Sequence, residues 1–100
     1  MGLGSNANVH DTCLRILRSR GFSLRVEGEL ESDGSFPIHK LWYAEKDGIS
    51  LYADNPIELL GLAGIYEYHQ PTEDVPYWWK VDGDDIEGEL YEAAWGPFDT

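Results

Sequence analysis

The spacing of apolar positions divides this chain into short elements. Near the N-terminus, apolar residues recur every three or four positions, which is the spacing of one helix face. They are Val9, Cys13, Leu14, Ile16 and Leu17. Three arginines and then Gly21 follow, as expected where a helix ends, because cations complement the helix dipole and glycine adopts the conformation that stops the helix. The pattern predicts a helix over about residues 7 to 20.

The period then changes to two, which is typical of half-buried strands. Phe22, Leu24 and Val26 alternate with polar residues, and further strands are predicted over residues 39–45 and 49–53. Asp47-Gly48 between the last two is a strong signal for an antiparallel hairpin with a two-residue turn. The connections are too short for crossover helices, so we expect an antiparallel sheet.

A second helix is predicted to begin after Asn55. Asn55 suits the N-cap, Pro56 suits the first helical position, and Glu58 lies three residues after the cap. The helix is expected to run to about residue 68 with Leu59, Leu60, Leu62, Ala63 and Tyr66 on its buried face. Gly61 and Gly64 would destabilise an exposed helix, so we expect them to face the sheet.

The C-terminal part predicts one more strand and one more helix. Tyr77–Val81 has the aromatic and β-branched composition of a strand, with one tryptophan on each face. Ile86 to Trp95 returns to helical spacing, with Asp84 or Asp85 as the cap. We therefore predict an α+β fold in which two to three helices pack on an antiparallel sheet of about four strands, in the order α-β-β-β-α-β-α.

Length and composition favour one small domain that spans residues 1–100. The chain is 42% hydrophobic and has thirteen aromatic residues, enough for one core. It has no apolar stretch long enough to span a bilayer, and its N-terminus lacks the features of a signal peptide. Cys13, the single cysteine, is expected to be a buried thiol. These features predict a cytoplasmic protein with no membrane association.

The charge is unevenly distributed along the chain. Residues 1–50 carry six basic and seven acidic residues, whereas residues 51–100 carry one basic residue against twelve acidic ones. The net charge of −12 disfavours a nucleic-acid partner, because the phosphate backbone attracts basic proteins. Three of the four tryptophans lie in the acidic half. Aromatic anchors beside carboxylates favour a basic protein partner.

No pattern for catalysis, metal binding or a cofactor is found. Counted from Asp82, the acidic run places Ile86 at the fifth position and Glu87 at the sixth, where an EF-hand requires an oxygen ligand and glycine. The three histidines have no metal-binding spacing, and no serine lies in a nucleophile elbow. We therefore predict no catalytic residue, metal or cofactor.

The predicted partner-binding surface lies in the C-terminal region of the chain, over about residues 71 to 95. It comprises Tyr77, Trp78, Trp79, Asp82, Asp84, Asp85, Glu87 and Glu89. Two alternatives remain: a small enzyme, either metal-dependent or based on carboxylates with His39 or His69, and a domain that forms a homodimer through apolar surface. The oligomeric state is expected to be monomer or homodimer.

The segment Asp54-Asn55-Pro56-Ile57-Glu58-Leu59-Leu60-Gly61-Leu62 resembles a recurrent pattern in small bacterial proteins of unassigned function. Its residues already account for a helix cap, so the resemblance implies no active site. More loosely, a small acidic α+β domain is similar to the immunity proteins that neutralise bacterial toxins. That likeness implies a protein partner with a basic site.

Overall fold

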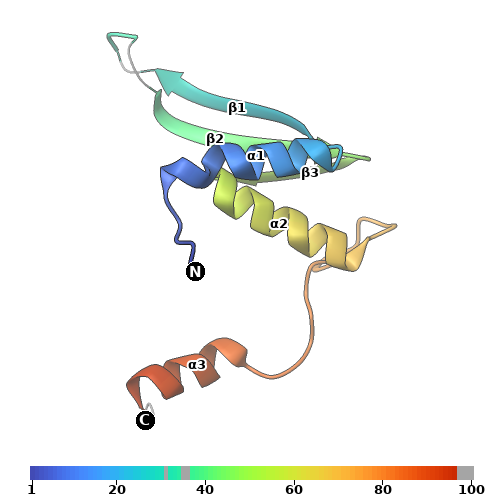
Figure 1. Ribbon diagram of the computed structural model, residues 1–100. Coiled ribbons are helices and arrows are strands. Elements are labelled where there is room, and N and C mark those ends of the chain that lie inside the picture. Colours follow the sequence, from blue (N-terminus) through green and yellow to red (C-terminus); the bar gives the residue numbers. More distant parts are fainter. Residues whose placement is uncertain (31, 35–36, 97–100) are drawn as a thin grey trace.

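The computed structural model describes residues 1–30, 32–34 and 37–96. Its elements are η1 (Ala7–Val9), α1 (His10–Ser19), β1 (Ser23–Leu30), β2 (Pro37–Lys46), β3 (Ile49–Ala53), α2 (Pro56–His69) and α3 (Ile86–Trp95). In the described part of the chain the sheet has three antiparallel strands in the order β1-β2-β3, and α1 and α2 cover one of its faces (Figure 1). The α+β class is confirmed, and so is the order of the elements apart from the fourth strand.

The hairpin between β2 and β3 forms as its turn residues predict. Asp47 and Gly48 both have positive φ, 49° and 83°, as a two-residue turn of the I′ type requires. The register then places Tyr43 opposite Tyr52 and Ala44 opposite Leu51. Successive side chains point to opposite faces of a strand, so the tyrosine pair lies on the face away from the helices.

The core lies between α2, α1 and the inner face of the sheet. Asn55 caps α2 as predicted, because its Oδ1 accepts a hydrogen bond of 2.9 Å from the Glu58 amide. The buried cluster consists of Leu17, Phe22, Ala44, Leu51, Ala53, Leu59 and Ala63. Cys13 is also buried, which confirms its predicted role. The fold therefore rests on apolar contacts among α1, α2 and the strands.

Two glycines of α2 do not lie where we predicted. Gly61 and Gly64 are exposed, and a Cβ added at either would meet nothing within 4 Å. The face of α2 that packs on the sheet is instead set by Leu59 and Ala63, which lie four residues apart. The prediction that these glycines allow close approach to the sheet is wrong.

The predicted fourth strand at Tyr77–Val81 is also wrong. Tyr77 has φ 59°, and the Lys80 amide donates to the Tyr77 carbonyl at 3.0 Å, so this segment folds into a turn. The Trp79 carbonyl lies 2.9 Å from Nε2 of His69, at the end of α2. Contacts with α2 thus replace the ladder hydrogen bonds that a strand would need.

Helix α3 forms as predicted but stands apart from the rest of the fold (Figure 1). Asp85 caps it, because its Oδ1 accepts a hydrogen bond of 3.1 Å from the Gly88 amide. No other described helix or strand packs extensively against it. The radius of gyration is 17.3 Å, whereas a compact chain of this length has about 13 Å.

None of the helices that the structure describes has both the length and the apolar character to cross a bilayer.

A pair of glycine substitutions tests this arrangement. Gly28 lies in β1 with the His39 carbonyl directly where a Cβ would be, so we expect Gly28→Ala to lower the free energy of unfolding by about 1–3 kcal/mol. Gly61→Ala meets open space in a helix and should raise it by about 0.5–1 kcal/mol. Urea denaturation measures both. Equal effects of the two substitutions would contradict the packing described here.

Candidate functional site

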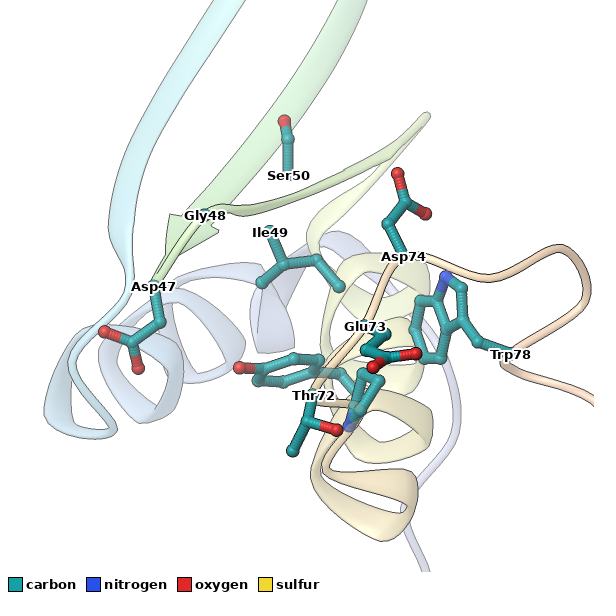
Figure 2. Close-up of a pocket in the computed structure, with 10 residues that line it drawn as sticks. Asp47, Gly48, Ile49, Ser50, Thr72, Glu73, Asp74 and Trp78 are labelled. Atoms are coloured by element: carbon teal, nitrogen blue, oxygen red, sulfur yellow. The ribbon is translucent and has the colours of Figure 1, made fainter.

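A hollow of about 340 Å³ opens between the β2–β3 turn and the loop that follows α2. Figure 2 shows the turn on one side and the loop, with Thr72, Glu73 and Asp74, on the other. Its lining consists of Asp47, Gly48, Ile49, Ser50, Tyr66, Pro71, Thr72, Glu73, Asp74 and Trp78. Two segments more than twenty residues apart in the chain therefore form one concave surface.

A row of aromatic rings forms the fixed part of this hollow. Trp78 packs edge-on against Tyr66, with 6.4 Å between ring centroids, and against His69 at 6.2 Å. Tyr66 in turn packs edge-on against the buried ring of Phe22 at 6.3 Å. Aromatic pairs at such distances are favourable beyond their buried area. The row thus links the half-buried Trp78 to the core and positions it beside the loop.

The charged residues that line the hollow are all acidic. Asp47, Glu73 and Asp74 line it, and its lining contains no lysine or arginine. Lys46, the basic residue beside the turn, is held elsewhere, because its Nζ donates to the Arg20 carbonyl at 2.6 Å. Carboxylates next to aromatic faces attract a cation both by charge and through the ring quadrupole. The hollow therefore suits a positively charged group.

The structure separates the residues of the predicted partner-binding surface. Trp78 lines the hollow, whereas Tyr77 and Trp79 are not part of its lining and pack edge-on against each other with 5.9 Å between ring centroids. Trp79 is the more exposed of the two tryptophans. The five predicted carboxylates lie beyond them, on the linker of residues 80–85 and on the first turns of α3: Asp82, Asp84, Asp85, Glu87 and Glu89.

The sequence gives Asp47 and Tyr66 only structural roles, in the hairpin turn and on the buried face of α2. Glu73 and Asp74 lie within residues 71–95, where the interface is predicted, but they are not among the eight residues named for it. Pro71 and Pro76 bracket the loop of Glu73 and Asp74, and they are the sequence signal for a binding loop, because prolines restrict the backbone at both of its ends. Only the tertiary fold brings the loop to the hairpin.

The described residues contain no group of three His, Cys, Asp or Glu side chains that could hold a metal ion. His39 borders a hollow along β1 and β2, while His69 borders one beside Trp79 and Val81. The two histidines considered for an enzyme thus lie at different sites.

No family model, curated protein or solved structure matches this chain.

Proposed function

We propose that this protein is a non-enzymatic binding module that recognises a basic protein partner, and that a lysine or arginine of the partner enters the hollow between the β2–β3 turn and the loop after α2. The observation that supports this best is the lining itself, in which three acidic residues and two aromatic residues border one hollow without any lysine or arginine. A surface of this kind selects for positive charge and rejects anions.

Each part of the lining has a role in this proposal. Trp78 and Tyr66 offer ring faces or edges to the aliphatic and cationic parts of the incoming side chain, an interaction of about 0.5–2 kcal/mol. Glu73 lies nearest Trp78 and would pair with the charge of the incoming side chain, while Asp47 from the turn and Asp74 from the loop, whose carboxylates point away from each other, add negative potential at the two rims (Figure 2). The carboxylates of the linker and α3 lie outside the hollow, so they contribute longer-range attraction that salt screens.

The setting that we propose is that of a bacterial, cytoplasmic, immunity-like protein. Its partner would be a toxin whose basic site is covered when one cationic side chain is held in the hollow. The small size and the net charge of −12 support this extension.

A matched pair of charge variants tests the proposed site. The probe is a capped hexapeptide with two arginines, titrated calorimetrically at low ionic strength. We expect the pocket variant Asp47→Asn/Glu73→Gln/Asp74→Asn to weaken binding roughly tenfold or more, since it removes the carboxylates nearest the bound cation. The control variant Asp82→Asn/Asp84→Asn/Glu92→Gln removes the same charge outside the hollow and should weaken binding less than about threefold. Equal losses in the two variants would show that net charge alone attracts the peptide, and would overturn the site.

A further inference from the structure

A second concave surface lies between α1 and the β1 edge of the sheet, and its lining differs in charge from the first. It has a volume of about 470 Å³. Its apolar lining consists of Leu14, Leu24, Val26 and Trp42, and its charged lining of Asp11, Arg15, Arg18 and Arg25. Val26 is 48% exposed although it points to the helix side of the sheet. We call this surface the α1–β1 groove.

Two of the three arginines of the α1–β1 groove are accessible to a new partner, whereas Arg25 is already paired with Glu27 and Glu45. Arg18 is exposed and has no ion-pair partner among the described residues. Arg15 donates to Asp11 at 2.7 Å, but both side chains are largely exposed, and such surface pairs contribute little to stability. The hydrogen bond with Asp11 is also the main reason that the pKa of Arg15 is raised. An incoming carboxylate can therefore pair with either arginine at little cost.

Helix α3 presents the complementary surface. At 100° per residue, Ile86, Leu90, Ala93 and Ala94 share one stripe of the helix. Glu87 borders that stripe on one side and Glu89 on the other. Ile86 and Leu90 are each 63% exposed, so the stripe has no cover within the described chain. A helix of ten residues is marginal in water unless its apolar face packs against something.

We infer that α3 of a second copy of this chain occupies the α1–β1 groove. The stripe of Ile86 and Leu90 would cover Leu14, Val26 and their apolar neighbours, while the glutamate that borders the stripe on the α1 side pairs with Arg15 or Arg18. The opposite charges of the two surfaces identify the occupant, because an acidic amphipathic helix is what a basic apolar groove accepts.

The position of α3 favours a second copy over the same chain. In Figure 1, α2 lies between α3 and the sheet. The Trp79 carbonyl is bonded to His69, so the free tether runs only from Lys80 to Asp85. Six extended residues span about 20 Å at most. If two copies exchange α3 about a two-fold axis, each groove instead receives the α3 of the other copy. The contact lies away from the hollow, so it does not depend on the proposed function.

Complementary charge reversal tests the exchange. Arg15→Glu/Arg18→Glu reverses the groove, and Glu87→Lys/Glu89→Lys reverses the borders of α3. In a dimer of either variant alone, the groove and the α3 that enters it carry charges of the same sign at both contacts. We therefore expect the dimer dissociation constant of each variant to rise roughly tenfold or more. In an equimolar mixture, every contact of the mixed dimer pairs opposite charges, and dimerisation should return. Sedimentation equilibrium over a range of concentrations measures all three samples, with circular dichroism to confirm folding.

Leu90→Asp supplies a test that does not depend on charge pairing, since it removes the centre of the exposed stripe and should also abolish the dimer. Glu92→Lys is the matched control, because Glu92 lies on the side of α3 away from the stripe and should leave dimerisation within about threefold of the original. A wild-type chain that stays monomeric at low ionic strength, whether α3 is free or docked within its own chain, would overturn the inference. So would a mixture that fails to restore the dimer.

Discussion

We expect Leu59→Ala to lower the free energy of unfolding by about 3 kcal/mol. Leu59 is fully buried in the cluster that joins α2 to the sheet, and truncation would leave a cavity lined by side chains that cannot collapse into it. A loss of this size corresponds to a fall in Tm of roughly 10–20 °C for a domain of about 100 residues. Urea denaturation should show a lower midpoint with an unchanged slope.

Ile65→Ala is the control for this substitution. It lies on the same helix and removes a similar volume, but Ile65 is 40% exposed, so we expect a clearly smaller loss, below about 1 kcal/mol. If Ile65→Ala proved as damaging as Leu59→Ala, then α2 would not pack on the sheet through the face described here.

The second large effect is expected at the hollow. Trp78→Ala should weaken binding of the arginine hexapeptide roughly tenfold or more, because it removes the ring that the row of aromatic contacts holds beside the three carboxylates. Trp78 is half-buried and lies in a loop, so we expect the free energy of unfolding to fall much less than in Leu59→Ala. Calorimetric titration gives the affinity, and urea denaturation gives the stability.

Two further variants separate a binding role of Trp78 from a structural one. Trp78→Phe keeps an aromatic ring against Tyr66 and should recover part of the affinity. Trp79→Ala removes a neighbouring ring that packs edge-on against Tyr77 outside the hollow, and should leave the affinity within about threefold of the original. If Trp79→Ala weakened binding as much as Trp78→Ala, the binding surface would extend over the exposed linker instead.

The sequence predicts those elements whose signals are local. The Asp47-Gly48 turn and the Asn55 cap are formed by residues within a few positions of each other, and both appear in the structure. The alternation from Phe22 to Val26 likewise sets which side of the sheet is buried. At such places, backbone chemistry and the hydrophobic pattern favour the same conformation.

The parts that sequence alone does not predict depend on distant contacts. Tyr77–Val81 has strand composition, but Trp78 within it packs against Tyr66 and His69 of α2, and the chain turns instead. Asp47 and Glu73 line the same hollow, although they come from segments that no sequence spacing relates. The predicted surface included Trp78 but extended along the chain into α3, whereas the hollow extends across the fold to the hairpin.

The most direct test of the central claim, that a cationic side chain enters the hollow, is a titration of the isotope-labelled protein with the arginine hexapeptide, followed by NMR at low ionic strength. We predict saturable shifts of the amides of Gly48, Ile49 and Thr72 and of the indole N–H of Trp78, because these groups surround the hollow. Shifts confined to the linker and α3, with the amides of the β2–β3 turn unchanged, would contradict the account.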